Sequence, residues 1–244
     1  MIDQTGGRAV RSRSARALFV TCLADTLQPS VGRATVAVLE RLGLEVVFPR
    51  GQTCCGQLHL NAGYPDVARA LGRGFVEVFA GFDAIVAPSG SCVAHVRAHA
   101  GADGADPEGV AGRTWELSEF LVDRLGVVEV GSGYEGSLTY HPTCHSLRSL
   151  RLDGQPESLL RAVSGLELRP LPDATECCGF GGLFAVRYAD VSTAMLTDKL
   201  RSVEHTGAGA VCACDASCLL HIGGGLERRG SPVRAVHLAE VLAS

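Results

Sequence analysis

Short apolar runs alternate with amphipathic segments along most of the chain. The runs have the length and composition of buried strands, and the segments between them place their apolar residues on one face of a helix. Ser30 and Gly43 are expected to cap and to end the first of these helices. The expected strands are residues 17–21, 44–48, 84–87, 138–140, 166–171 and 210–213. The expected helices are residues 31–42, 65–79, 115–125 and 191–204, and a further helix opening at Cys218. This alternation predicts an α/β fold with mainly parallel sheets and helices on both faces.

The cysteines follow a repeated pattern along the chain. One set comprises Cys22, Cys54, Cys55 and Cys92, and the other comprises Cys144, Cys177, Cys178 and Cys218. Corresponding positions differ by 122, 123, 123 and 126 residues, and each vicinal pair is followed by glycine. The same order at nearly the same spacing indicates a duplicated unit. We therefore expect two pseudo-symmetric tandem units, a first repeat at residues 17–130 and a second at 131–244, after a flexible segment at 1–16.

Each set of cysteines is expected to gather at one edge of its sheet. Cys22, Cys92 and Cys144 each follow an expected strand, and the two vicinal pairs lie in loops that also follow strands. Ligands of open α/β sheets bind beyond the carboxyl ends of the parallel strands. The pattern therefore predicts a binding site in each half of the chain.

Charge and composition exclude several classes of function. The 244 residues carry a net charge of −4 and 46% hydrophobic residues, which is typical of a globular protein and not of a nucleic-acid binder. The polar N-terminal stretch lacks the apolar core of a secretory signal, and no apolar run approaches the ~20 residues of a membrane span. We therefore expect a cytoplasmic protein without a transmembrane segment. Thiols stay reduced there, so that metal binding, redox chemistry or simple burial must explain the ten cysteines.

The spacing of the cysteines favours a multinuclear metal centre. Structural zinc sites usually take closely spaced knuckles, whereas the intervals here are 31 and 36 residues in the first half and 32 and 39 in the second. The side chains of vicinal cysteines diverge, so that they reach two metal atoms more easily than one. An iron–sulfur cluster is the preferred interpretation, and zinc binding, thiol–disulfide chemistry and inert thiols remain alternatives.

Five stretches of the sequence carry a family resemblance. They are residues 51–57 (GQTCCGQ), 87–92 (APSGSC), 140–145 (YHPTCH), 177–182 (CCGFGG) and 218–224 (CLLHIGG). These tandem Cys-Cys-Gly boxes resemble the cysteine-rich domain found in heterodisulfide reductase and in the iron–sulfur component of glycolate oxidase. The resemblance is strongest to the lactate utilization protein A family, and it covers nearly the whole chain from about Arg16.

The resemblance implies an iron–sulfur subunit that transfers electrons in the oxidation of L-lactate to pyruvate. It also implies partners, namely other iron–sulfur and accessory subunits of a lactate-oxidising complex. The expected cofactor is a [4Fe–4S] cluster, one or two per chain, held by the eight cysteines of the two sets; no catalytic residue is assigned. Alternative functions are a thiol–disulfide reductase like heterodisulfide reductase, a glycolate oxidoreductase subunit, and a zinc-stabilised interaction module without catalysis.

The sequence departs from the five-cysteine box of the heterodisulfide reductase relative. The motif C-x-x-C is replaced by Ser89-x-x-Cys92 in the first half and by Asp215-x-x-Cys218 in the second. Asp215 is expected to cap its helix. Cys212 and Cys214 are expected to be core thiols of a strand, with a replacement ligand or a redox pair as alternatives.

Further candidates lie beside the cysteine motifs. His141 and His145 flank Cys144, and we expect hydrogen bonding to sulfur or backbone from them, with cluster ligation as the alternative. Four other histidines could serve proton transfer: His59, His95, His99 and His221. Residues 131–136 match G-x-G-x-x-G but run into a strand, so that we interpret them as a linker and not as a nucleotide site.

Overall fold

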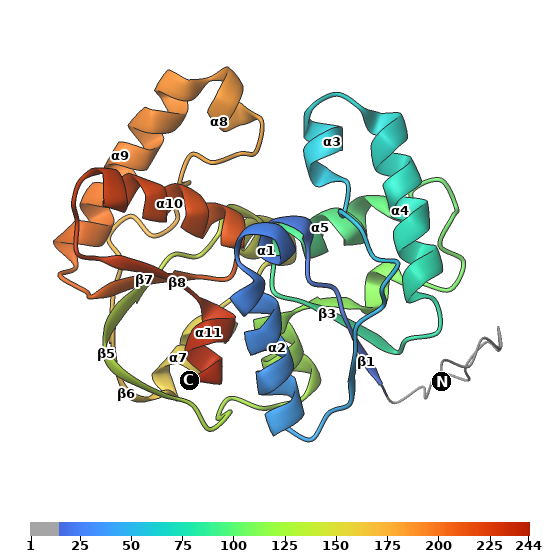
Figure 1. The fold of residues 1–244 in the computed structure, drawn as a ribbon, viewed down its shortest axis with the longest axis horizontal. Coiled ribbons are helices and arrows are strands. Elements are labelled where there is room, and N and C mark those ends of the chain that lie inside the picture. The colour runs from blue at the N-terminus through green and yellow to red at the C-terminus, as the bar shows by residue number, and fades with distance from the viewer. Residues whose placement is uncertain (1–14) are drawn as a thin grey trace, which may run out of the picture.

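The computed structural model describes residues 15–244, which form two four-stranded sheets (Figure 1). The first sheet has the order β2-β1-β3-β4 and the second has the order β6-β5-β7-β8. All neighbouring strands run parallel. The strands are β1 (Arg16–Leu18), β2 (Val46–Val47), β3 (Ala84–Ala87), β4 (Thr114–Glu116), β5 (Gly133–Tyr140), β6 (Ser164–Arg169), β7 (Ala210–Ala213) and β8 (Arg234–His237). The expected fold of two tandem α/β units is confirmed.

Strand register gives the correspondence between the halves residue by residue. In the first sheet Leu18 of β1 lies opposite Val86 of β3, and in the second Tyr140 of β5 lies opposite Cys212 of β7. The next residue in each half extends the ladder, with Phe19 N–H donating to the Val86 carbonyl at 2.9 Å and His141 N–H donating to the Cys212 carbonyl at 2.8 Å. Phe19 and His141 are therefore equivalent positions.

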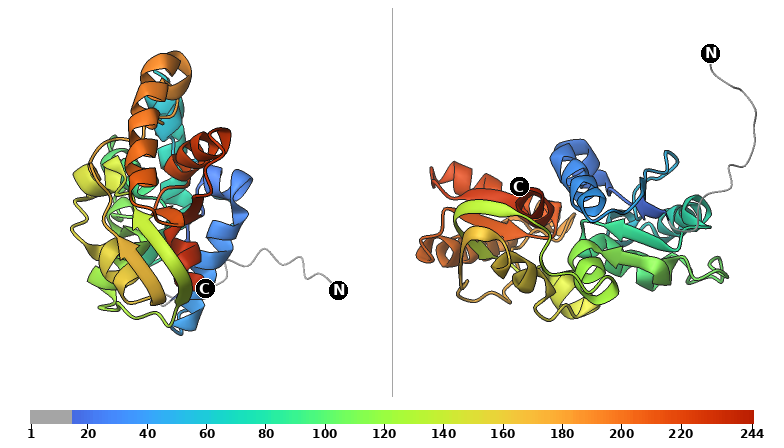
Figure 2. Two further views of the ribbon diagram at one scale, coloured as in Figure 1. Left: turned by 90° about the vertical axis from the view of Figure 1, so that its left-hand side faces the viewer. Right: turned by 90° about the horizontal axis from the view of Figure 1, so that it is seen from below.

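Helices connect the strands and cover both faces of the sheets. The longer helices are α2 (Pro29–Arg41), α4 (Pro65–Phe79), α5 (Gly90–His99), α9 (Ala189–His205) and α10 (Ala216–Arg228). The shorter helices are α1 (Cys22–Leu27), α3 (Gln57–Asn61), α6 (Leu117–Glu119), α7 (Gln155–Arg161), α8 (Phe184–Arg187) and α11 (Leu238–Ala243). A 3-10 turn η1 (Ala111–Arg113) and the π-helical turns η2 (Phe120–Arg124) and η3 (Ser146–Leu150) complete the connections. Figure 2 shows the two units side by side, with α2 and α11 between them.

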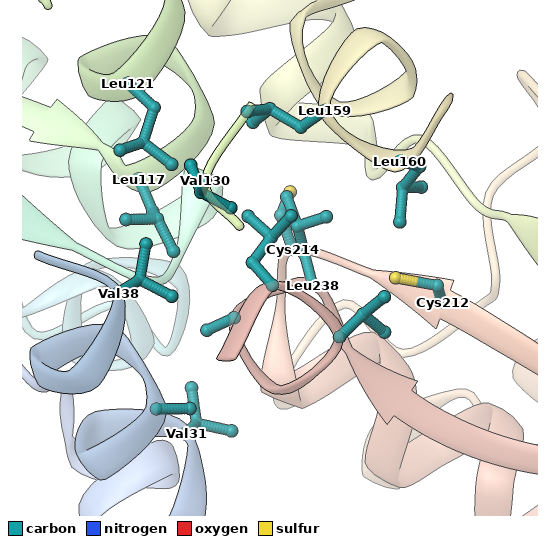
Figure 3. Close-up of a cluster of buried hydrophobic side chains, with 14 of the residues drawn as sticks. Val31, Val38, Leu117, Leu121, Val130, Leu159, Leu160, Cys212, Cys214 and Leu238 are labelled. Carbon is teal, nitrogen blue, oxygen red and sulfur yellow. The ribbon is translucent and has the colours of Figure 1, made fainter. Parts of the chain in front are cut away.

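The two sheets share one apolar core. Alternate residues of β3 and β7 face opposite sides, as the pleat requires, so that Val86 and Cys212 enter the shared core while Ile85 and Val211 enter separate outer cores. The shared core contains Val38 of α2, Leu117 of α6 and Leu238 of α11 (Figure 3). Both halves therefore lose apolar surface to each other and not only to their own helices.

Arg41 of α2 forms hydrogen bonds that connect the two units at the edge of the shared apolar core. Its guanidinium donates to the Val130 and Gly131 carbonyls, each at 3.2 Å, and to the Leu242 carbonyl at 3.1 Å and the Ala243 carbonyl at 2.6 Å. One side chain thus joins the first unit, the segment between the units and helix α11. The expected boundary at residue 130 remains a prediction.

Three local expectations were wrong. Ser30 lies inside α2, which begins at Pro29, because proline is well suited to the first turn, where its missing N–H costs nothing. The expected helix at 115–125 begins instead as strand β4, and Glu116 then caps α6 through its carboxylate. The expected linker at 131–136 already contains the start of β5. The fourth strand of each sheet and helix α11 were not predicted.

Residues 1–14 lie outside the described part, so the expectation for the N-terminal segment is untested; Arg16 is the first residue of β1. Among the helices of residues 15–244, none combines the length and the hydrophobicity that a membrane crossing requires.

Candidate metal centre

The eight cysteines of the two predicted sets line one cavity between the units. The cavity, with its open mouth, contains about 850 Å³ of empty space. Cys22 is the first residue of α1, and Cys92 and Cys218 are the third residues of α5 and α10. The vicinal pairs lie in the loops before α3 and α8, and Cys144 follows β5. The carboxyl ends of the strands of both sheets thus deliver their cysteines to a common space, where we had expected a separate site in each half.

Within each set the sulfur atoms contact one another in the same order. The Cys22 and Cys54 sulfurs are 3.5 Å apart, and Cys55 contacts both Cys54 and Cys92. In the second half Cys144 contacts Cys177, and Cys178 contacts both Cys177 and Cys218. All ten cysteines are free thiols. Each set therefore presents four neighbouring thiols to the cavity.

Thiol–thiol contacts polarise each set in the same way. Hydrogen bonds from the Cys22 and Cys55 thiols lower the pKa of Cys54, and those contacts together with burial raise the pKa of Cys22 and of Cys55. The pKa values of Cys177, Cys144 and Cys178 shift in the corresponding directions for the same reasons. A thiolate is the ligand form of cysteine, so that Cys54 and Cys177 are the members of each set most readily available to a soft cation.

The glycine after each vicinal pair has a backbone role that explains its place in the motif. Gly56 and Gly179 have φ of 98° and 89°, which side chains other than glycine rarely adopt. This turn points the Gly56 N–H at the Cys54 sulfur and the Gly179 N–H at the Cys177 sulfur, at 3.4 Å in both halves. A Cβ atom on either glycine would also meet a helix backbone, at 3.2 Å from the Ala68 carbonyl oxygen and at 2.7 Å from that of Ser192.

Asp215 does not cap its own helix, contrary to the sequence-based expectation. Its side chain makes no bond to the start of α10 and crosses to the other unit. There it accepts from the Ser89 hydroxyl at 2.6 Å and from both the N–H and the hydroxyl of Ser91, and it also accepts from the Thr143 hydroxyl at 2.7 Å. The carboxylate is 1% exposed and lies at the positive end of α5. It joins the two helices that carry Cys92 and Cys218.

His141 lies against the second set of cysteines, but its ring does not make the hydrogen bonds that we expected. The ring is fully buried, and neither Nδ1 nor Nε2 has a hydrogen-bond partner among residues 15–244. One of its nitrogen atoms and the Cys178 and Cys218 sulfurs lie within 4.8 Å of one another, close enough to hold one metal ion. Burial, reinforced by Lys199, lowers the pKa of His141 to about 3. The ring is neutral at physiological pH.

Comparisons with known proteins show which family the chain resembles. The family described as a cysteine-rich domain matches residues 16–97 and 138–223. A lactate utilization protein A from Bacillus pumilus is 46% identical over 233 residues, which cover 93% of this chain and 98% of that protein. A protein of the same name from an Exiguobacterium species is 46% identical over 93% of this chain and 96% of its own.

The chain belongs to the lactate utilization protein A family. Among solved structures, a glutamate racemase from Francisella tularensis covers 95% of this chain and 78% of its own, at 10% identity and a TM-score of 0.37, which is too distant to support an argument. The two matched segments contain all the cysteines and end before β4 and β8. The fourth strand of each sheet therefore lies outside the matched segments.

The two spare cysteines belong to the protein interior. Cys212 and Cys214 are fully buried in the shared core, as expected for core thiols, and they are absent from the described residues that line the cavity. The Cys214 thiol contacts the Ser146 hydroxyl at 3.0 Å. Burial raises the pKa of both thiols, which keeps them protonated. They offer no ligand to the cavity.

Three further histidines, His145, His95 and His99, occupy different environments near the first set of cysteines. The His145 ring contacts the Gln57 amide at 3.1 Å across the two units. His95 is buried, burial lowers its pKa to about 4, and its ring lies 4.7 Å from that of His99.

Arg97, on the same helix as His95, forms a bidentate ion pair with Glu119, at 2.9 and 2.8 Å, so that its guanidinium is already paired with a carboxylate of the protein. None of these geometries was evident from the sequence.

Proposed function

We propose that this chain is an iron–sulfur subunit of an oxidoreductase system and transfers electrons in the oxidation of L-lactate to pyruvate. The observation that carries the proposal is the convergence of two sets of four thiols on one cavity. The substrate, lactate, is inferred from the names of the relatives, which are called lactate utilization protein A. Its oxidation to pyruvate releases two electrons and two protons, which such a system must pass on.

The donor set fits an iron–sulfur cluster. Four thiols joined by a chain of contacts match the Cys₄ ligation of [2Fe–2S] and [4Fe–4S] clusters, and a bound cluster would supply reversible one-electron chemistry. Cys22, Cys54, Cys55 and Cys92 would hold one cluster, and Cys144, Cys177, Cys178 and Cys218 would hold a second. The N–H groups of Gly56 and Gly179 would remain directed at ligand sulfurs and stabilise their negative charge.

The surroundings of the cavity support a cytoplasmic protein with partner subunits. Reduced thiols at a cavity mouth persist in the cytoplasm, where disulfides are rare. We assign lactate binding to a partner subunit, because the described residues that line the cavity include no arginine or lysine to pair with a carboxylate. The partners would be other iron–sulfur and accessory subunits of the lactate-oxidising complex.

A zinc site is the second candidate, and a specific contact favours it. His141, Cys178 and Cys218 present nitrogen and sulfur within 4.8 Å, a donor set that also suits structural zinc. In that case the chain would be an interaction module without redox chemistry.

Metal analysis after anaerobic reconstitution separates the two candidates. We expect iron and acid-labile sulfide in multiples of four per chain, and an electron paramagnetic resonance signal on reduction. Cys54→Ala and Cys177→Ala should each remove the iron of one set, whereas Cys212→Val should retain all of it. Val86 occupies the position equivalent to Cys212, so that this control keeps the core filled. Less than one iron per chain with stoichiometric zinc would overturn the proposal.

A test of the reaction itself uses the reconstituted subunits of the system. With the partner subunits present, L-lactate should bleach the visible absorption of the clusters in this chain, and glycolate should not. Bleaching by glycolate alone would replace lactate by another 2-hydroxy acid, and no bleaching by either would overturn the assignment of the chain to this reaction.

A further inference from the structure

The two sets of thiols sit on the same scaffold but face different neighbours. The residue that follows β1 is Phe19, and the equivalent residue after β5 is His141. Phe19 packs edge-on against Phe75 of α4, with ring centroids 5.0 Å apart. In the second unit His141 instead has Lys199 of α9 as its charged neighbour. An aromatic ring in one half is thus replaced in the other by an imidazole with a cationic neighbour.

The buried His141 ring needs a partner. Two ring nitrogens without hydrogen bonds in a fully buried position carry the desolvation cost of polar atoms with no compensation from residues 15–244. The nearest chemistry that satisfies an imidazole nitrogen there is a cation held by Cys178 and Cys218, since the three donor atoms lie within 4.8 Å of one another. Neutral imidazole is also the form that binds metals.

The obvious alternative for a fifth donor in the second half is occupied elsewhere. Asp215 stands where the five-cysteine box has a further cysteine, but both its oxygens accept bonds from Ser91 and Thr143. Its carboxylate is therefore engaged between α5 and α10 and does not offer an oxygen to the cavity without breaking those bonds. Among the polar groups against the second set, His141 has its nitrogens unpaired within the described residues.

We propose that His141 is a ligand of the second centre, bound through a ring nitrogen to the metal atom that Cys178 or Cys218 also contacts. The inference rests on the proposed function and extends it: the first centre has four sulfur donors, and the second has four sulfur donors and one nitrogen. The two centres therefore differ in their ligands, and because ligand type is one of the factors that set the potential of a cluster, we expect the two centres to have unlike reduction potentials.

The decisive measurement detects nitrogen at the cluster. The reconstituted protein is prepared with ¹⁵N-labelled histidine, reduced in steps, and examined by pulsed electron paramagnetic resonance. We expect one of the two centres, distinguished from the other by its reduction potential, to show the strong ¹⁵N coupling of a directly bound nitrogen. His141→Phe should abolish this coupling and move that centre's potential towards that of the first, and His221→Phe should preserve the coupling.

The internal repeat offers a reciprocal variant. Phe19→His places an imidazole at the equivalent position of the first unit, and His141→Phe copies the residue that the first unit already accommodates. Combined in one chain, the two changes should transfer the nitrogen coupling from the second centre to the first. Transfer of the coupling would establish that this position, and not a general proximity of histidines, determines ligation.

Metal-free protein provides a readout that needs no cluster. His141→Phe removes two polar atoms that are unpaired within the described residues from a buried position, and its urea midpoint should equal or exceed that of the wild type when metal is absent. With the clusters loaded, the same variant should be less resistant to urea than the wild type. An iron-loaded wild type without strong nitrogen coupling would overturn the ligation alone, whereas a wild type that takes up no iron would overturn the proposed function.

Discussion

The two halves of the molecule share their backbone design and differ in the side chains placed on it. In both, Gly56 or Gly179 directs an N–H to the first sulfur of a vicinal pair at 3.4 Å. The order of sulfur contacts and the directions of the pKa shifts also coincide. Around this common frame the first half places the aromatic cluster of Phe19, Phe75 and Phe79, and the second places His141 and Lys199. The backbone shared by the two halves therefore brings the thiols together, whereas the side chains around each set determine its local polarity.

The contact between the halves is equally unsymmetrical. Ser89 and Asp215 precede equivalent helices and face each other as an isolated bridge. Ser89 accepts from the N–H of Cys92 in its own helix, and Asp215 accepts from the N–H of Ser91 in the other helix. The α5 N-terminus therefore receives both caps, and α10 receives none from these two side chains. The second unit thus stabilises the helix that carries Cys92 of the first.

The largest expected effect comes from removing that cross-unit cap. Asp215→Ala leaves the Ser89, Ser91 and Thr143 hydroxyls without their buried acceptor, and we expect a loss of about 3–5 kcal/mol in the free energy of unfolding. Ser89→Ala should cost only about 1–2 kcal/mol, because it removes one cap and one donor. Urea unfolding of the metal-free, reduced protein measures both. Equal losses in the two variants would show that the two caps are interchangeable after all.

The next effect concerns two buried groups at equivalent strand ends. Glu116 ends β4 and caps α6, and His237 ends β8 and caps α11. Burial raises the pKa of Glu116 from 4.5 to about 7, so that its contribution to stability is complete below pH 4.5 and is lost as the pH rises through 7. We expect this loss to reach about 3 kcal/mol. Burial lowers the pKa of His237, so that its contribution is present above pH 6.5 and is lost as the pH falls.

Denaturation midpoints measured across pH 5–8 test whether Glu116 and His237 contribute to stability with opposite pH dependence. Glu116→Gln should remove the loss of stability that the wild type suffers on the alkaline side, and His237→Gln should remove the loss on the acidic side. The hydrogen bonds of the two side chains agree with a protonated Glu116 and a neutral His237. His237 Nε2 donates to the Pro88 carbonyl at 3.2 Å, whereas Glu116 Oε1 has no partner in residues 15–244. Parallel pH profiles for Glu116→Gln and the wild type would exclude a protonated Glu116.

The smallest effect distinguishes the two motif glycines. Alanine at either position must adopt a positive φ, which costs roughly 1–2 kcal/mol. Gly179→Ala should cost more than Gly56→Ala, because its Cβ would lie 2.7 Å from the Ser192 carbonyl oxygen while that of Gly56→Ala would lie 3.2 Å from the Ala68 oxygen. Thermal unfolding of the two single variants measures the difference. A larger loss at position 56 would contradict the tighter packing of the second box.

Much of the arrangement could be predicted from the chain alone. Helix α4 has the predicted ends at residues 65 and 79, and strands β3 and β7 have their predicted bounds, because amphipathic spacing and short apolar runs report burial directly. The repeated cysteine spacing identified the eight side chains that line the cavity. The fourth strands were missed because β4 has three residues and is followed at once by the helical turn of α6. Aligning residues 116–121 with 237–242 would have revealed them, since both begin a capping box.

The rest depends on distances across the two units. Aspartate before a helix ordinarily caps that helix, and the sequence has no signal that the α5 N-terminus lies closer to the Asp215 carboxylate. Similarly, a histidine near a cysteine is expected to find a hydrogen-bond acceptor, and only the packing shows that the His141 ring finds none among the described residues. These are tertiary facts, and periodicity or composition carries no information about them.

The shared apolar core has a consequence for the order of events during synthesis. Val31 and Val38 of α2 lie in the same core as Leu238 of α11, and Arg41 reaches the carbonyls of residues 242 and 243. A nascent chain that ends near residue 130 thus exposes an unfinished apolar face, whatever its first sheet has achieved. The cavity also lacks half of its wall until the second set of cysteines has emerged. The shared core is therefore complete only after residues 238–243 have been translated, later than all eight cysteines that line the cavity, so that a chain stalled before them keeps apolar surface exposed.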